Sequence, residues 1–326
     1  MDKVVVFRFQ SGQGLGNQLW SYASLRGVAH KIGAEFYVLN RGAFKGHGFL
    51  EIEFESKSIK NLNIENHFNE KLFYDDDLSY FASSFDERIV EIEGVTEIQG
   101  LFQSEKYFFG KTNEIGKWIK LNQEMVEYSK QFKGKCIINI RGGEYKRFKN
   151  LILPSTYWHN AINLVKERGI ADDFLIVTDD PRYTEKLLPG IPVLKGGVQE
   201  CYAAIYGASS VIVSNSSFAY YPIKSREDAP FVIAPAHWSR YGNKFNRWAA
   251  PGNFDEKWNW LNNQGDLMKV DECKDIIRST ESLYNSYNIC VRPGLVGESR
   301  LRKKIPRPIR LWVKKMVSIL FPKHIG

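Results

Sequence analysis

Short apolar runs alternate with helical stretches through the second half of the chain. Strands are predicted at 136–141, 173–178, 191–194, 211–213 and 231–234, and helices at about 155–168, from Pro181 onward and at 200–206. The run Cys136–Ile140, in which Asn139 is the one polar residue, suits a strand buried on both faces. Strands alternating with helices indicate a parallel sheet, so this half predicts a Rossmann-like α/β domain.

The N-terminal residues begin with the same alternation. Val4–Phe9 predicts a strand, a glycine-rich loop follows, and Glu35–Leu39 predicts a second strand. Between them, apolar residues spaced by three and four predict a helix that ends at Gly33: Leu19, Tyr22, Leu25, Val28, Ala29 and Ile32. We therefore expect two α/β domains, 1–133 and 134–270, both Rossmann-like, followed by C-terminal helices and a tail at 271–326.

The glycine-rich loop excludes two common nucleotide-binding motifs. The pattern Gly-x-Gly-x-x-Gly fails, because its third glycine falls on Asn17 or Leu19 when counted from Gly12 or Gly14. No Gly-Lys-Ser/Thr follows, which excludes a P-loop. Gly14 and Gly16 let the main chain approach a ligand, and Asn17 stands near a helix N-terminus, where backbone N–H groups favour phosphate. In the alternative interpretation, Asn17 only caps the helix.

Polar residues follow three predicted strands of the second half. They are Arg141-Gly142-Gly143-Glu144, Asp179-Asp180 and Ser214-Asn215-Ser216-Ser217-Phe218. Ligands of open α/β sheets bind outside the carboxyl ends of the strands, so these loops predict one site. Arg141 and the Ser/Asn run would hold phosphate, and Asp179 would accept hydrogen bonds from a base or ribose. Two alternatives stay open: Arg141 and Glu144 pair in a solvated loop, and the Ser/Asn run caps the next helix.

The net charge of +8 belongs to the C-terminal tail. Residues 300–326 carry nine Lys and Arg and no acid, which leaves 36 basic and 37 acidic residues elsewhere. A neutral body argues against a nucleic-acid partner. Apolar and basic residues interleave over 300–321 and predict peripheral contact with an anionic membrane; a helix docked on the body is the alternative.

The other features exclude several classes of site. Cys136, Cys201, Cys273 and Cys290 form no Cys-x-x-Cys pair, so neither a zinc site nor a disulfide framework is expected. The start lacks the apolar region of a signal peptide and no run approaches 18 apolar residues, so we expect a cytoplasmic protein at the inner face of the membrane. For 75–77, a solvated acidic turn is favoured over a metal site. For the tryptophans near His237 (Trp238, Trp248, Trp258 and Trp260), core packing is favoured over carbohydrate stacking.

Three motifs in this order resemble the family 11 glycosyltransferases, the α-1,2-fucosyltransferases. Gly14-Leu15-Gly16-Asn17-Gln18-Leu19, then Tyr22-Ala23, resembles G-L-G-N-Q-M-F-x-Y-A; Asn139-Ile140-Arg141-Gly142-Gly143-Glu144-Tyr145 resembles H-x-R-R-G-D-Y; and Ser214-Asn215-Ser216-Ser217-Phe218, then Tyr220-Tyr221, resembles S-N-S-S-F-x-W-W. Thr178-Asp179-Asp180 stands where the family has S-D-D, and the resemblance covers roughly residues 4–260.

The resemblance implies an α/β fold of the GT-B type, with two Rossmann-like domains facing across a cleft. Residues 1–133 would then form the acceptor side and residues 134–270 the nucleotide-sugar-binding side. It also implies GDP-fucose as donor, inversion at the anomeric carbon, a galactose hydroxyl of a glycan as acceptor, and no cofactor or metal. Arg141, the Asn17 loop and the Ser216 and Ser217 hydroxyls would stabilise charge on the departing β-phosphate. Glu144 is the candidate base.

The chain departs from the family pattern at three positions. Asn139 stands for its His, Gly142 for its second Arg and Glu144 for its Asp. One cation fewer should weaken phosphate binding unless Lys146 or Arg147 compensates. Another nucleotide-sugar donor or linkage, and a nucleotide-sugar-binding protein without turnover, therefore remain alternatives. A dinucleotide-dependent oxidoreductase is disfavoured by Asn17.

Overall fold

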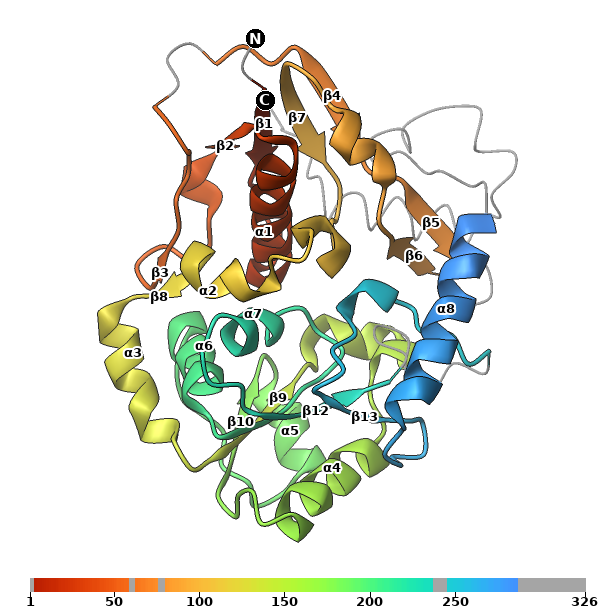
Figure 1. Ribbon diagram of the computed structural model, residues 1–326. Helices are drawn as coiled ribbons and strands as arrows, with labels where there is room; N and C mark the ends of the chain where they lie inside the picture. Colours follow the sequence, from red (N-terminus) through yellow and green to blue (C-terminus); the bar gives the residue numbers. More distant parts are fainter. Residues whose placement is uncertain (1–2, 59–61, 76–79, 237–244, 287–326) are drawn as a thin grey trace. The chain divides into compact units, whose positions relative to one another are not determined.

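The chain forms two compact α/β units (Figure 1). The structure, a computed structural model, describes residues 3–58, 62–75, 80–236 and 245–286. Unit 1 comprises 1–45, 52–112 and 283–326, and unit 2 comprises 46–51 and 113–282. Each unit contains a parallel sheet, so the predicted α/β class with two Rossmann-like domains is confirmed. The predicted cleft between the domains stays a prediction.

Unit 1 is organised around a four-stranded sheet of order β2-β1-β7-β4, parallel throughout. Its strands are β1 (Val4–Arg8), β2 (Glu35–Leu39), β4 (Asn66–Asn69) and β7 (Val95–Gln99). Helix α1 (Leu15–Ile32) connects β1 to β2 and ends on Gly33, which has the left-handed φ of 66°. The βαβ start is therefore confirmed. Helix α1 is buried on most sides, not on one face only, because Trp20, Ser21 and Ser24 are also covered.

Unit 2 contains a five-stranded parallel sheet of order β10-β9-β11-β12-β13. Its strands are β9 (Cys136–Ile140), β10 (Phe174–Thr178), β11 (Ser210–Ile212), β12 (Phe231–Pro235) and β13 (Asn259–Leu261). One face packs on α4 (Ser155–Glu167) and on Leu187 and Leu188 at the end of α5 (Pro181–Leu187). Helix α6 (Val198–Gly207) contacts β9 and β10 on the other side (Figure 1). Burial on both faces explains why these strands are almost continuously apolar.

Apart from shifts of one or two residues at the ends of elements, the prediction for unit 2 differs from the structure in two places. The run 191–194 forms only one bridge, from Val193 to Ile176, and β13 was not predicted.

The tryptophans Trp248, Trp258 and Trp260 are buried and pack against one another with ring centroids 4.8 and 5.6 Å apart, so core packing is confirmed for them. His237, Trp238, Asp76, Asp77 and the tail at 300–321 lie outside the described residues.

The division between units differs from the predicted boundary near Gly134. Residues 113–133 belong to unit 2, because α2 (Ile115–Trp118) contacts α7 (Tyr220–Lys224) and α3 (Gln123–Ser129) contacts α6. A Cβ at Gly207 in α6 would lie 2.0 Å from the Ser129 carbonyl oxygen, so only glycine permits this helix contact. The sequence did not predict it, because the partners lie some 80 residues apart.

Two short pairs of strands and a terminal helix complete the described structure. The pairs are β3 (Leu50–Glu51) with β8 (Lys120–Leu121) and β5 (Leu72–Asp75) with β6 (Tyr80–Ser83), both antiparallel. Helix α8 (Val270–Ser286) follows β13. Short 3-10 helices occupy Arg41–Ala43, Glu87–Glu91, Glu105–Phe108, Thr112–Glu114, Lys130–Phe132, Gly143–Arg147, Lys149–Leu151 and Pro251–Asn253. Within the described ranges, no helix combines the length and apolarity needed to cross a membrane.

Candidate active site

The three polar strand ends of unit 2 do come together, at the carboxyl edge of its sheet. Strand β9 lies between β10 and β11, with Ile140 in register with Thr178 and Ile138 with Ile212. The loops that follow them are joined by side chains. The β9 loop binds the β10 loop through Asp179 and the β11 loop through Tyr145.

Arg141 is held by the carboxylate that follows the neighbouring strand. Its Nη1 lies 2.8 Å from Asp179 Oδ2, and its guanidinium lies over the Tyr145 ring at 5.2 Å from the centroid. Glu144 Oε1 is 3.8 Å from Nη2, so the open alternative of an Arg141–Glu144 pair is present only as a long contact. Arg141 Nε is buried, and the described residues supply no acceptor for it. A buried donor without a partner is costly, so we expect a ligand or a water molecule to accept a hydrogen bond from this atom.

The two glycines after Arg141 are required by close packing. A Cβ at Gly142 would lie 2.7 Å from Asp180 Cβ and 2.8 Å from Tyr183 Cδ1, and one at Gly143 would lie 2.5 Å from Asp179 Oδ2. The Gly142 N–H donates to Asp179 Oδ1 at 2.9 Å. Asp179 therefore binds Arg141 and the loop with both of its oxygens, an arrangement that orients the guanidinium.

Asp180 and Lys146 form a second link between the β9 and β10 loops. Asp180 is the N-cap of α5 and accepts from Tyr183 N at 3.2 Å, with Pro181 in the first turn as predicted. Lys146 Nζ forms an ion pair with Asp180 Oδ2. The hydrogen bond from Lys146 lowers the pKa of Asp180 below its ordinary value. Lys146, one of the two cations considered as substitutes for the missing second Arg, is thus engaged by a carboxylate.

The Ser/Asn run after β11 does not cap a helix. Helix α7 begins at Tyr220 and its N-cap position is Ala219, so the run precedes the capping position and does not occupy it. The first three polar residues are instead buried and bonded inside unit 2. Ser214 Oγ donates to Asn139 Oδ1 (3.3 Å), Asn215 Nδ2 donates to the Leu151 carbonyl (3.1 Å), and Ser216 Oγ accepts from Phe218 N (3.4 Å). Ser217 and Phe218 are the partly exposed members, and Asn215 Oδ1 is a second buried atom to which the described residues offer no donor.

Tyr145 ties the arginine loop to the Ser/Asn run. Its hydroxyl donates to the Asn215 carbonyl at 3.3 Å while its ring lies under Arg141. Tyr145→Phe keeps the ring and removes only the hydroxyl. We expect it to lower the free energy of unfolding by about 1 kcal/mol, the usual net value of one hydrogen bond. Urea denaturation monitored by tryptophan fluorescence measures this change. Tyr128→Phe, which removes a hydroxyl from a half-buried tyrosine of α3, is the matched control and should change nothing.

Gly14, Gly16 and Asn17 lie in unit 1 and the other predicted site residues lie in unit 2. Gly14, in extended conformation, is the N-cap of α1, and a Cβ there would meet no atom within 4 Å. Asn17 is the third residue of the helix rather than its cap, so the capping alternative was wrong. Its Oδ1 accepts from Gln103 Nε2 at 2.9 Å.

Several site residues were missed from the sequence. Gln103, Asn139 and Tyr145 orient predicted residues. Asn139 and Tyr145 had a signal, because they begin and end the second motif of the resemblance, and Gln103 had none. A pocket of about 10 Å³, room for roughly one water molecule, lies at the carboxyl ends of β1 and β7. Gln13 lines it, and the described residues give its buried Oε1 no partner. The described part of the chain contains no group of three or more His, Cys, Asp and Glu side chains arranged for a metal.

Comparison with known proteins gives distant structural neighbours. No protein-family model matches the sequence, and no curated protein matches it. The chain is similar to the NodZ α-1,6-fucosyltransferase of Bradyrhizobium soaked with GDP-fucose (14% identity, TM-score 0.43, 71% of this chain and 94% of that one). It is similar to POFUT1 in complex with GDP (12%, 0.42, 72% and 98%) and to the E. coli heptosyltransferase WaaC with ADP (10%, 0.38, 87% and 100%). At these scores the likeness assigns no activity to this chain.

Proposed function

We propose that the protein is a glycosyltransferase that moves fucose from GDP-fucose to a galactose hydroxyl of a glycan, forming an α-1,2 link with inversion. One observation carries this proposal. At the edge of a parallel sheet, Arg141 is oriented by Asp179 and presents a buried Nε for which the described residues offer no acceptor. The ordered set of motifs from Gly14 to Phe218 that resembles the α-1,2-fucosyltransferases supplies the donor and the linkage.

The proposed chemistry is a single displacement at the anomeric carbon. The acceptor oxygen forms a bond to that carbon while the bond to the β-phosphate oxygen breaks, and GDP leaves with the electron pair. Arg141, the amide of Asn17 and the Ser217 hydroxyl stabilise the charge that grows on the phosphate. The acceptor proton passes to Glu144, whose side chain is 55% exposed. In this proposal the charge on the phosphate is balanced by side chains, and no metal or other cofactor takes part.

The proposal extends to the place of action. The tail at 300–321 binds anionic lipid, which keeps a cytoplasmic enzyme at the inner membrane face, where a lipid-linked precursor of surface polysaccharide is a suitable acceptor. Binding of the full chain to vesicles with and without anionic lipid tests this point. Equal binding to both would contradict it.

Thermal unfolding with nucleotides tests the donor. GDP, GDP-fucose, GDP-mannose, UDP-galactose and NAD are compared without added metal. At about 100 times its dissociation constant a ligand stabilises the folded state by about 2.7 kcal/mol, which raises the melting temperature by several degrees. We expect GDP and GDP-fucose to do so. If only another sugar nucleotide raised the melting temperature, the proposed donor would be wrong and that nucleotide would take its place. A higher melting temperature with NAD would favour the oxidoreductase.

The rival interpretation is a nucleotide-sugar-binding protein without turnover. It is favoured by the missing second cation, because Gly142 has no room for a side chain and Lys146 is paired with Asp180. Release of GDP from GDP-fucose in the presence of a galactoside acceptor separates the two. Nucleotide binding without release of GDP for any galactoside would leave the binding protein.

A further inference from the structure

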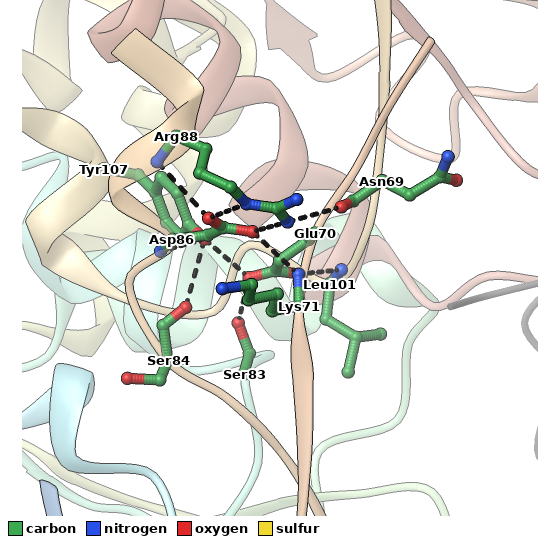
Figure 2. Close-up of polar contacts among 9 residues, drawn as sticks. All are labelled: Asn69, Glu70, Lys71, Ser83, Ser84, Asp86, Arg88, Leu101 and Tyr107. Carbon is green, nitrogen blue, oxygen red and sulfur yellow. Dashed lines mark hydrogen bonds and ion pairs between the residues drawn. The ribbon is translucent and has the colours of Figure 1, made fainter. Parts of the chain in front are cut away.

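A fully buried carboxylate, Glu70, holds the segment Gly100–Gln103 in unit 1, and Figure 2 shows its contacts with Leu101, Ser83 and Tyr107. Glu70 follows β4 directly and the segment follows β7, the neighbouring strand. Its Oε2 accepts from Leu101 N at 2.7 Å and Phe102 N at 2.9 Å. Its Oε1 accepts from Ser83 Oγ at 2.6 Å and Tyr107 Oη at 2.9 Å. None of these four donors is charged, so hydrogen bonds alone must offset the burial of a carboxylate.

The segment is shaped to fit this carboxylate. A Cβ at Gly100 would lie 2.5 Å from Glu70 Oε2, so only glycine allows the approach. Phe102 has a φ of 49°, in the left-handed region that a bulky residue occupies only when its surroundings impose it. The Phe102 carbonyl also accepts from Ser24 Oγ of α1 at 3.1 Å. The path of residues 100–103 therefore depends on Glu70.

The far end of the segment reaches a predicted site residue. Gln103 N donates to Ser83 Oγ at 3.0 Å, and Ser83 in turn donates to Glu70. The Gln103 side chain donates from Nε2 to Asn17 Oδ1 at 2.9 Å. With its carbonyl oxygen turned to Gln103, the Asn17 amide directs its N–H₂ group away from Gln103. An anion requires donors, so this is the orientation in which Asn17 can bind phosphate.

The other buried carboxylate of the network, Asp86, is not connected to the segment in this way. Arg88 binds Asp86 with Nε and Nη2, at 2.8 Å and 2.5 Å, and Lys71 N binds it at 2.9 Å (Figure 2). Tyr107 stands between the two carboxylates: its hydroxyl donates toward Glu70 or the Ser84 carbonyl and accepts from Asp86 N. Asp86 is therefore an internal comparison for Glu70, with similar burial and different partners.

We propose that Glu70 is a positioning residue for the phosphate contact of Asn17, acting through the segment Gly100–Gln103, and that its ionisation makes this contact depend on pH. The inference rests on the proposed function, since it presumes a nucleoside diphosphate donor. When Glu70 takes up a proton, its bonds to Leu101 and Phe102 lose the strength that a charged acceptor provides, and the hold on the segment weakens.

Burial is the largest of the causes that raise the pKa of Glu70 from 4.5 to about 7, against the lowering effect of its four hydrogen bonds. The folded state thus keeps a proton that the unfolded state has released between these two pH values. This group therefore lowers the free energy of unfolding as the pH rises from 4.5 through 7, since the unfolded state binds fewer protons there. Over the same pH range, we expect the affinity for the nucleotide to fall as the pH falls.

The test compares binding of GDP and of GMP, which lacks the β-phosphate, to the full chain. Gln103→Ala removes the link with the least change to the fold and should weaken GDP binding about tenfold, the loss of roughly one hydrogen bond to a charged group, while GMP binding stays unchanged. When Asn17 is already replaced by Ala, Gln103→Ala should weaken GDP binding little further, because the effects of coupled residues are not additive. Asp86→Asn is the control and should leave both affinities unchanged, whatever its effect on melting temperature.

Glu70→Gln keeps the acceptor for Leu101 and Phe102 and removes the charge. Between pH 5.5 and 8 the affinity of the wild type for GDP should rise about tenfold more than that of Glu70→Gln, because a charged acceptor strengthens the hold on the segment. The slope that remains in Glu70→Gln reports the ionisation of the GDP phosphate itself, and this variant should also lose the stability slope. Three outcomes would each overturn the inference. Gln103→Ala could weaken the binding of GDP and of GMP equally, its effect on GDP affinity could add fully to that of Asn17→Ala, or Glu70→Gln could show the same dependence of GDP affinity on pH as the wild type. Wild-type protein that binds neither nucleotide would instead refute the proposed function, and the inference with it.

Discussion

Arg141→Ala should lower the rate of glycosyl transfer by about 10²- to 10³-fold, the loss typical of removing one preorganised donor from a developing negative charge. The guanidinium is already aimed: Asp179 holds Nη1 at 2.8 Å and Tyr145 lies beneath it. Steady-state kinetics with GDP-fucose measure the change. The fall should lie mainly in kcat, because the charge on the β-phosphate grows as the bond breaks.

The same substitution should hardly change stability. Arg141 and Asp179 are 28% and 29% exposed, and ion pairs of this exposure contribute about 0–1 kcal/mol. Arg141→Lys keeps the charge but loses the planar guanidinium with its paired N–H donors, so it should retain only part of the activity. Arg168→Ala is the matched control, since this exposed arginine at the end of α4 lies over Phe231, and it should leave transfer unchanged. Undiminished transfer by a folded Arg141→Ala protein would remove this residue from the mechanism.

Gly142→Ala should lower both the stability of unit 2 and its activity. The new methyl group would lie 2.7 Å from Asp180 Cβ and 2.8 Å from the Tyr183 ring, so the start of α5 must move. Overpacking of this kind costs about 1–3 kcal/mol. Calorimetry should show the loss of stability as a lower melting temperature. Activity should fall as well, because Asp179, next to the displaced Asp180, orients Arg141.

Gly42→Ala is the matched control for this experiment. No atom lies within 4 Å of a Cβ at Gly42, and its φ is not in the left-handed region, so the same substitution should be silent there. A Gly142→Ala protein as stable as the Gly42→Ala protein would show that the loop adapts without strain. That result would also reopen the position for the second arginine found in the resembling family.

The edge of the sheet in unit 2 could be predicted from the sequence. Strand β9 has the bounds of its apolar run, and α5 starts at Pro181 as predicted, because burial on both faces and a fixed proline φ leave local signals. Once strands and helices alternate, parallel order follows, and the ends of β9, β10 and β11 must share one edge. The joining of Arg141, Asp179 and the Ser/Asn run is therefore largely a property of the sequence.

What each of these side chains binds was decided only by the tertiary structure. Asp179, which was expected to accept from a ligand, holds Arg141 and Gly142. Asn17 lies in the first turn of α1, near the helix end as expected, but its partner Gln103 is 86 residues away. Glu70 gave no local signal, since its partners Leu101 and Phe102 lie 31 and 32 residues further along the chain. A local pattern records whether a residue is buried. The partner that makes its burial tolerable comes from a distant segment, and only packing brings the two together.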